Sequence, residues 1–524
     1  MSHPDLMKWP PELSEAQLQA LTLLATTYAL SHGLNYLPVA DVQPPAPTSA
    51  IHAPLALFPS PFPRNLFSLA RRLQRAYNVL YARVALDEEF LDNVMGEEKG
   101  VGKVDQFTGQ LWRRWKRLRD EGLTQDLHLG LFRSDYLMHA PRPEEPVTLK
   151  QVEFNTISSS FGSLSQKAAE LHEYLYASTG YYGTSPVLKK ENFPQNRTIA
   201  GLAEGLAEAH KAYNVPDARI LFVVQGGERN VFDQRWLEYE LLEKYSIHVV
   251  RQTMTQLLES AQVHPDNRTL HVTLPQGLLP DGANSVEIST VYLRAGYTPI
   301  DYPTSAHYDL RYLLESSRAI QCPSIQLQLA GGKKVQEVLT RPGVLESFLC
   351  DPGRWGAEVF TPEEVDEIRG SWMGMWGLNE DVPTGSAHDP RETSGVHKAR
   401  ESASNLVLKP QREGGGNNIY KDAIPSFLDN LPPEEREAWI AMELIAAPQG
   451  LENYLVRAGG GTDSTVKTEV VSELGIFGWA LFGGPEKKIK EKEVGWLVRT
   501  KGKDSNEGGV AAGFSVLDSL ILID

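Results

Sequence analysis

Apolar positions near the start of the chain follow helical spacing. The stretch 14–33 carries apolar residues at this spacing, with Ser14 as a candidate N-cap and Gly33 as a stop signal. The same pattern predicts helices over 64–95 and 105–121. Between the first two of these regions, the Pro-rich piece 44–63 predicts an extended connector.

Strand patterns dominate the next part of the chain. The alternating stretch VTLKQVEFN predicts a strand that ends at Asn155. Further on, a helix over 199–213 precedes the apolar run 218–224, and a helix over 234–245 leads to the apolar run 247–250. Strands that alternate with helices in this way are typical of parallel α/β units. The run VYLRAGY predicts another strand over 291–297.

The C-terminal third is less regular. The segment 371–404 is rich in Gly, Ser, Pro and charged residues, which predicts a long, mobile surface insertion. The charged run EKKIKEKE over 486–493 favours a solvated hairpin tip or helix face, and the final SLILID favours a strand or a buried tail. Together the patterns predict an α/β (α+β) protein without internal repeats.

Composition narrows the class of protein. The chain has 524 residues, enough for two or three domains, and its net charge of -16 argues against nucleic acid or an anionic membrane as the general partner. Its two cysteines, Cys322 and Cys350, fit a reducing compartment without disulfides. We find no secretory signal at the N-terminus and no apolar run of transmembrane length, so we expect a cytosolic protein.

The strand that ends at Asn155 continues into a polar loop, in the stretch QVEFNTISSSFGS. Alternation places Gln151, Glu153 and Asn155 on one face, where a carboxylate and an amide oxygen would suit Mg²⁺. The serines that follow offer hydroxyls to a polar ligand. Taken alone, the stretch also fits an ordinary half-buried strand followed by a serine-rich turn.

A glycine run lies in LKPQREGGGNNIY, between residues 408 and 420. Backbone amides of consecutive glycines can bind phosphate oxygens, and Lys409 and Arg412 add positive charge. Because Glu413 would repel a phosphate, we expect a divalent cation between them. The alternative is a solvated turn.

Two more regions could contact ligands. ERNVFDQR follows an apolar strand, at the end where parallel sheets bind ligands, although Asn230 could equally cap a helix. In LVRTK, Arg499 and Lys501 alternate and can face one site, and EGGVAAG beyond it could bring backbone amides to a small ligand or pack tightly against a neighbouring segment. The signatures of P-loop enzymes, dinucleotide-binding folds, zinc proteases and serine hydrolases are absent from the sequence.

Taken together, these stretches resemble the eukaryotic-type glutathione synthetases of the ATP-grasp superfamily. The resemblance runs in one order from PLALFPSPFP, near residue 54, to GGVAAGFSVLD, and includes LFRSDYLM, CPSIQLQLAGGKK and SELGIFG. It implies an ATP-grasp fold with an inserted parallel α/β substrate-binding domain, a helical N-terminal region and a glycine-rich lid. The implied domains are 1–197, 198–326 and 327–524.

The resemblance also implies a function. The chain would be a cytoplasmic homodimer that joins γ-glutamylcysteine to glycine, using ATP and two Mg²⁺ ions per subunit and passing through an acyl phosphate. Matching motifs imply metal ligands at Glu153, Asn155 and Glu413. Stabilisation of the acyl-phosphate and tetrahedral states would come from Arg133, Ser160, Gly414, Gly415 and Arg499.

Ligand contacts follow from the same resemblance. Nucleotide contacts are implied at Glu153, Lys333, Lys409, Gln411, Glu413, Gly414, Gly415, Gly416, Asn417, Asn418, Tyr420, Met442, Glu443, Leu444, Ile445, Glu473, Lys501 and Glu507, with Met442 and Ile445 at the adenine and Glu473 at the ribose. Substrate contacts are implied at Arg133, Ile157, Ser158, Ser159, Ser160, Glu228, Arg229, Asn230, Gln234, Arg294, Ala295, Gly296, Tyr297, Arg499, Val510 and Ala511.

The sequence departs from the family pattern at three of these positions. Ala295 stands where an Asp is usual, Leu444 where a Lys is usual, and Glu507 where an Asp is usual. Two alternatives remain beside the ligase: an ATP-grasp ligase for another small acceptor, such as β-alanine or serine, and a nucleotide-binding regulator without activity.

Overall fold

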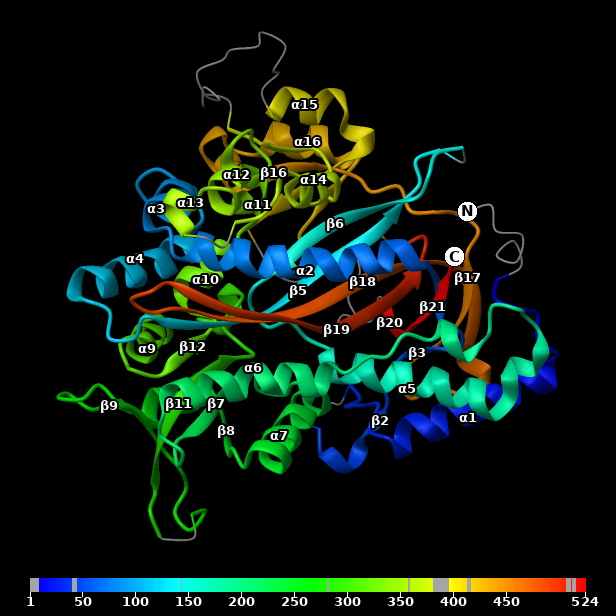
Figure 1. Cartoon of the computed structure of the whole chain (residues 1–524), viewed down its shortest axis with the longest axis horizontal. Helices are drawn as coiled ribbons and strands as arrows, with labels where there is room; N and C mark the ends of the chain where they lie inside the picture. The colour runs from blue at the N-terminus through cyan, green and yellow to red at the C-terminus, as the bar shows by residue number, and fades with distance from the viewer. Residues whose placement is uncertain are drawn as a thin grey trace.

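The computed structural model describes residues 9–39, 45–142, 144–279, 282–356, 359–379, 395–411, 416–505, 510 and 515–524. Thirteen strands within these ranges form one mixed sheet (Figure 1). They are β3 (Leu55–Ala56), β5 (Leu127–His139), β6 (Thr148–Asn155), β7 (Arg219–Val224), β8 (Val249–Thr253), β9 (Ala261–Val263), β10 (Leu270–Thr273), β11 (Ser285–Leu293), β12 (Ile320–Cys322), β17 (Glu452–Val456), β18 (Thr465–Gly483), β19 (Lys488–Gly502) and β20 (Ser515–Asp518).

The long antiparallel strands β5, β18 and β19 form the middle of this sheet. Asp135 of β5 pairs with Gly475 of β18, and Glu473 of β18 pairs with Arg499 of β19. Successive side chains of a strand point to opposite faces, so one face of these strands can carry charged groups while the other is apolar.

Helices cover both faces of the central strands (Figure 1). On one face, α2 (Arg64–Ala85) buries apolar side chains such as Leu73, Tyr77 and Leu80 against Ile476 and Trp496. On the other face lie α5 (Gly162–Thr179) and α6 (Thr198–Tyr213). The remaining helices are α1 (Glu15–Ser31), α3 (Glu88–Met95), α4 (Gln106–Glu121), α7 (Val231–Tyr245), α8 (Met254–Ser260), α9 (Ser305–Glu315), α10 (Ile325–Ala330), α11 (Lys333–Leu339), α12 (Val344–Leu349), α13 (Pro352–Trp355), α14 (Pro362–Gly370), α15 (Gly395–Glu401) and α16 (Ala423–Asn430).

Several helix predictions hold. α1 begins after Ser14, whose hydroxyl accepts a hydrogen bond from the Gln17 backbone while the Gln17 side chain accepts one from the Ser14 backbone. The predicted helix over 64–95 is two helices instead. The break falls where Asp87 caps α3 by accepting a hydrogen bond from the Phe90 backbone. A capping carboxylate inside an apolar pattern starts a new helix.

The predicted α/β unit is present. β7 pairs in parallel with β8 and with β11, and β12 pairs in parallel with β11 and β5, so the unit joins the central sheet. The strand predicted over 291–297 is wrong in its bounds, because β11 ends at Leu293. Ala295, Gly296 and Tyr297 lie in the loop beyond it, where Asp301 accepts hydrogen bonds from the Gly296 and Tyr297 backbones.

A smaller sheet lies beside α11. Its four strands are β13 (Met375–Gly377), β14 (Leu406–Pro410), β15 (Ile419–Tyr420) and β16 (Trp439–Glu443). The predicted surface insertion 371–404 is therefore wrong at both ends, since β13 and α15 pack into this part of the fold. Residues 380–394 lie outside the described part of the chain.

Short strands complete the fold. β1 (Asn35–Tyr36) pairs with β2 (Ile51–His52), and β4 (Ser60–Pro63) pairs with β21 (Leu520–Ile523). The predicted connector 44–63 thus contains strands, and the C-terminal tail is the predicted buried strand. The charged run 486–493 lies at the tip and start of β19, where Lys490 and Lys492 pair with Glu208 and Glu204 of α6.

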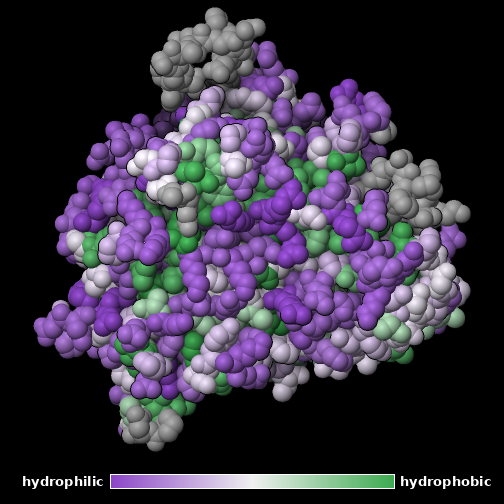
Figure 2. All heavy atoms as spheres, in the orientation of Figure 1, coloured by the Kyte–Doolittle hydropathy of each residue, from purple (hydrophilic) through white to green (hydrophobic). Residues whose placement is uncertain are grey.

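On the face drawn in Figure 2, hydrophobic side chains form small patches between hydrophilic ones. Within the described ranges, each helix is too short or too polar to cross a membrane.

Candidate active site

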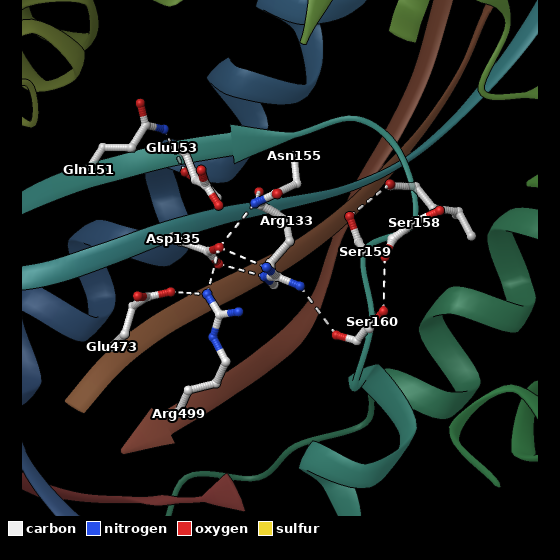
Figure 3. A network of polar contacts seen from close by, with 12 residues as sticks. Arg133, Asp135, Gln151, Glu153, Asn155, Ser158, Ser159, Ser160, Glu473 and Arg499 are labelled. Atoms are coloured by element: carbon white, nitrogen blue, oxygen red, sulfur yellow. Dashed lines mark hydrogen bonds and ion pairs between the residues drawn. The ribbon is translucent and has the colours of Figure 1, made fainter. Parts of the chain in front are cut away.

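A buried carboxylate, Asp135 of β5, lies at the centre of the site (Figure 3). Arg133, two residues earlier on the same strand, donates to both of its oxygens, from Nε at 2.6 Å and from Nη2 at 2.8 Å. The alternation of the strand places both side chains on one face, and the paired glycine at 475 leaves room above them.

A second arginine reaches the same carboxylate from another strand. Arg499 of β19 donates from Nη2 to Asp135 Oδ2 at 3.1 Å and to the Glu473 carboxylate. Burial raises the pKa of Glu473, although Arg499 opposes this shift. The site therefore combines the buried guanidinium group of Arg133 and the partly buried one of Arg499 with two carboxylates. An additional anion can bind only through N–H groups that do not already donate to Asp135 or Glu473.

β6 carries the predicted metal ligands. Glu153 pairs with Asp135 and Asn155 pairs with Arg133, so both lie on the face of the arginines. The prediction for Gln151 is wrong. A β-bulge at Val152 shifts the register, so that Gln151 pairs with Tyr136 and bonds Ser134 on the other face.

Two lysines surround the carboxylate of Glu153. Lys333, at the start of α11, donates to Glu153 Oε2 at 2.8 Å, and Lys409 of β14 donates to the Val152 carbonyl at 3.1 Å. Burial opposes ionisation of Glu153, but the charges of Lys333, Lys409 and Arg499 outweigh it and hold its pKa well below the usual range. Gln411, also predicted, connects these elements by accepting a hydrogen bond from the Lys334 backbone and donating to the Ala438 carbonyl.

The serine-rich loop between β6 and α5 has an unusual backbone. Ser158 and Phe161 have left-handed φ angles of 54° and 68°. A left-handed backbone conformation costs free energy for residues other than glycine, and it persists only where neighbouring groups stabilise it. Here the buried Asp233 of α7 holds the loop, accepting hydrogen bonds from the backbones of Phe161, Ser163 and Leu164. The conformation of the loop is therefore supported by hydrogen bonds within the protein.

Arg294 connects this loop to the α/β unit. It donates to Ser160 Oγ at 2.6 Å and to the Ser159 carbonyl at 3.2 Å, and Ser160 also accepts from Arg133 through its carbonyl. Ser158 donates to the Leu293 carbonyl. The loop thus brings the predicted residues Arg133, Ser158, Ser160 and Arg294 together.

The predicted residues of ERNVFDQR form a second small cluster. Glu228 accepts from the Asn230 backbone at 3.0 Å and from Gln234 Nε2 at 3.4 Å. Asn230 and Gln234 are buried. Nearby, Tyr297 donates to Gln225.

Some predicted substrate contacts point elsewhere. Arg229 donates to the Leu37 carbonyl and lies over the Tyr36 ring, away from the serine loop. Ile157 is part of the apolar core, and the Ser159 hydroxyl donates to the Leu131 carbonyl. Ala295 and Val510 are buried.

The predicted nucleotide residues gather on the smaller sheet. Met442 packs with Val407 and Met375, and Tyr420 and Leu444 lie against this cluster. Glu443 accepts a hydrogen bond from the Gly374 backbone, and Asn418 donates to the Tyr420 hydroxyl. Ile445, Gly416 and Asn417 lie in the adjoining segments, and Lys501 follows Arg499 on β19. By contrast, Glu473, predicted at the ribose, contacts Arg499.

Five predicted site residues lie outside the described part of the chain: Glu413, Gly414, Gly415, Glu507 and Ala511. Within the described residues, no three His, Cys, Asp or Glu side chains converge as a metal site. Glu153 and Asn155 nevertheless offer hard oxygen donors on one face, which fits Mg²⁺. The apolar cluster around Met442 fits the base of a nucleotide, and the two lysines near Glu153 fit its phosphates.

Two residues of the site were missed in the sequence. Asp135 stands in LFRSDYLM, two positions after Arg133, and alternation along a strand would have placed both on one face. Asp233 stands in ERNVFDQR, but its contact with the serine loop depends on how α7 packs on α5.

Comparison with known proteins gives a consistent picture. A family model described as eukaryotic glutathione synthase, ATP binding domain, matches residues 15–522. The glutathione synthetase of Dictyostelium discoideum is 35% identical over 514 residues, covering 97% of this chain and 100% of that protein. The glutathione synthetase of Homo sapiens is 37% identical over 505 residues, covering 96% of each chain.

A solved structure supports the fold. The apo form of a glutathione synthetase-like effector from Globodera pallida matches 98% of each chain with a TM-score of 0.72. Its sequence is 23% identical, so the likeness concerns the fold, which is of the ATP-grasp type.

Proposed function

Because the chain belongs to the eukaryotic glutathione synthetase family, we propose that the cluster around Asp135 is the centre at which it joins γ-L-glutamyl-L-cysteine to glycine. The chain is an ATP-dependent carbon–nitrogen ligase, and its products are glutathione, ADP and phosphate. The observation that carries the proposal is the convergence of Arg133, Arg499 and Glu153 from three strands of a chain that the family model matches over residues 15–522.

The chemistry explains why two arginines are needed. The cysteinyl carboxylate takes the γ-phosphoryl group of ATP, and the amine of glycine then attacks the carbonyl carbon and displaces phosphate. Negative charge collects first on phosphoryl oxygens and then on the tetrahedral carbon's oxygen. Preorganised guanidinium groups stabilise both states, which assigns this role to Arg133 and Arg499, aided by Ser160. The same role at Gly414 and Gly415 rests on their sequence motif.

Residues around Glu153 would hold ATP and Mg²⁺. Glu153, Asn155 and Glu413 would supply the metal ligands, and Lys333 and Lys409 would meet the phosphates. Mg²⁺ offsets the charge of the phosphate oxygens when it is bound. The base would lie against the Met442 cluster, with the lid through Asn418 closing over the phosphates.

The α/β unit and the serine loop would hold the dipeptide. Arg294, Glu228, Asn230 and Gln234 surround one end of this region with charge and amide groups suited to an amino acid moiety. Glycine would enter beside Arg499, near Val510 and Ala511. A small entrance would favour a small acceptor.

We also propose a cytoplasmic homodimer. Exposed apolar side chains support a second copy as partner: Leu23 and Leu30 on α1, and Tyr239 and Leu242 on α7. The two helices adjoin, because Trp236 of α7 donates to the Gly33 carbonyl just after α1.

The experiment is phosphate release from ATP, Mg²⁺ and γ-glutamylcysteine, with glycine present, omitted, or replaced by β-alanine or serine. We expect glycine-dependent release matched by glutathione formation. Release that requires β-alanine or serine instead would move the acceptor specificity. No release from folded protein that binds ATP would overturn the ligase in favour of a regulator.

A further inference from the structure

We propose that Asp135 is a positioning residue that aligns three groups of the reaction centre at once: Arg133, Arg499 and the amide of Asn155. The inference rests on the proposed function, since it assigns Asp135 a role in the same reaction. Asp135 itself would touch neither substrate nor metal. It acts through the groups that it holds.

The first argument is electrostatic. Arg133 and Arg499 reach Asp135 from β5 and β19, and three of their N–H groups donate to its two oxygens at 2.6, 2.8 and 3.1 Å. Two guanidinium groups at this separation repel each other in a buried site unless they share an anion. Asp135 is fully buried, so water does not screen it. Its carboxylate therefore keeps both arginines close together before a phosphoryl group arrives.

The second argument concerns the orientation of an amide. Asn155 donates from Nδ2 to Asp135 Oδ2 at 3.0 Å and to the Arg133 carbonyl at 3.2 Å. An ionised carboxylate only accepts hydrogen bonds, so it must face the NH₂ group of the amide. With both amide hydrogens engaged, Oδ1 is the atom that Asn155 presents as a ligand for a cation. Asp135 thereby fixes the metal-binding orientation of Asn155.

The third argument comes from the opposite strand. A Cβ atom at position 475, which pairs with Asp135, would lie 2.8 Å from Asp135 Oδ1 and 2.8 Å from Arg133 Cδ. Carbon atoms do not approach so closely, and so a side chain here would push the pair aside. The glycine in SELGIFG is thus explained by the space that the Arg133–Asp135 pair requires.

The test uses two variants that disturb Asp135 in different ways. Asp135→Asn removes the charge and brings an NH₂ group to the arginines and to Asn155. Gly475→Ala keeps every charge and displaces the pair. Asp105→Asn is the matched control. Asp105 is another buried carboxylate, outside the proposed site, and it caps α4 by accepting a hydrogen bond from the Thr108 backbone. Asn caps a helix equally well.

Two readouts separate positioning from mere folding. The first is the division of the loss between kcat and the KM for γ-glutamylcysteine. The second is Mn²⁺ binding, measured by electron paramagnetic resonance with a non-hydrolysable ATP analogue, which needs no turnover. We expect both variants to lose about 10- to 100-fold in kcat and in Mn²⁺ affinity, as when an outer partner of a metal ligand is removed. Analogue binding without metal should stay near that of the Asp105→Asn control. The melting temperature should fall in Asp135→Asn, because two arginines lose the buried anion that they share, and so all binding is measured well below it.

The outcomes are distinct. Wild-type Mn²⁺ affinity and kcat in both variants would overturn the role of Asp135. A loss in Asp135→Asn but not in Gly475→Ala would mean that only the charge of Asp135 matters, and it would overturn the positioning role. If Asp135→Asn fails to fold, Gly475→Ala decides by the same readouts. Absence of ligase activity in the wild-type protein would count against the proposed function, whereas the Mn²⁺ measurement would still test the alignment of Asn155.

Discussion

The ammonium group of Lys333 lies 2.8 Å from a carboxylate oxygen of Glu153. Lys333 is expected to meet the ATP phosphates, and Glu153 is expected to bind Mg²⁺. In this structure the two side chains bind each other instead. Metal would have to displace Lys333 from Glu153, and nucleotide would draw Lys333 away from it, so each ligand should favour binding of the other.

This relationship makes a prediction about Lys333→Met. Metal alone should bind about tenfold more tightly, because Glu153 loses its competing cation, while affinity for ATP falls by about 100-fold through the lost phosphate contact. Calorimetric titration with Mn²⁺ alone and with the ATP analogue measures both changes. Changes of the same sign would contradict competition for Glu153.

Arg294 should act on dipeptide binding. In Arg294→Lys the hydrogen bonds to Ser160 Oγ and the Ser159 carbonyl cannot both form, because an ammonium group lacks the planar fork of a guanidinium. We expect the KM for γ-glutamylcysteine to rise by about 10- to 100-fold and the KM for ATP to change little.

Arg229→Lys is the matched control for that variant. Its guanidinium bonds Leu37 and lies over Tyr36, so the KM for the dipeptide should change by less than about threefold. Equal effects of the two substitutions in steady-state kinetics would show that Arg229 also faces the dipeptide.

Gly416→Ala tests the proposed lid. Gly416 has a φ of +94°, and a Cβ there would meet no atom within 4 Å, so the cost of alanine is one of backbone conformation. A cost of about 1 kcal/mol in an exposed loop should leave the melting temperature unchanged and slow turnover several-fold, if this backbone closes over ATP. Unchanged turnover would indicate a simple turn.

Asp518 predicts how stability depends on pH. Burial raises its pKa to about 7, although Ser60, Thr500 and the Ser519 backbone donate to its carboxylate. Between about pH 4 and 7 the folded state therefore holds a proton that the unfolded state has lost, and the free energy of unfolding falls as pH rises. Asp518→Asn lacks this loss, which amounts to about 4 kcal/mol at most.

Urea unfolding of both proteins at several pH values checks this sign. The stability of the variant relative to wild type should increase from pH 4 to 7 and level off above. His172, whose Nδ1 lies 4.0 Å from Asp518, has a pKa lowered to about 4 by burial, and it remains in both proteins. A pH-independent difference would mean that Asp518 is ionised throughout.

Local sequence patterns account for part of the site. Alternation correctly placed Glu153 and Asn155 on one face, and also Arg499 and Lys501 on one strand, because these relations depend on neighbours within a strand. The same rule failed for Gln151, since a bulge at Val152 leaves no mark in the residue pattern. The family motifs supplied the remaining candidates, but not their partners.

Long-range packing accounts for the rest. Asp135 becomes the centre of the site because β5 lies beside β18, which in turn lies beside β19. Both β18 and β19 follow β5 by more than 300 residues in the chain. Arg229 turns away because Leu37 offers it a carbonyl and Tyr36 an aromatic ring. Neither relation is local, so periodicity and spacing could not reveal it.

The most direct test of the central claim follows one oxygen atom. γ-Glutamylcysteine labelled with ¹⁸O in its cysteinyl carboxylate is incubated with ATP, Mg²⁺, glycine and the protein, and the released phosphate is examined by mass spectrometry. Activation through an acyl phosphate predicts one labelled oxygen in the phosphate for each glutathione formed. Glutathione formed together with unlabelled phosphate would contradict this account of the reaction.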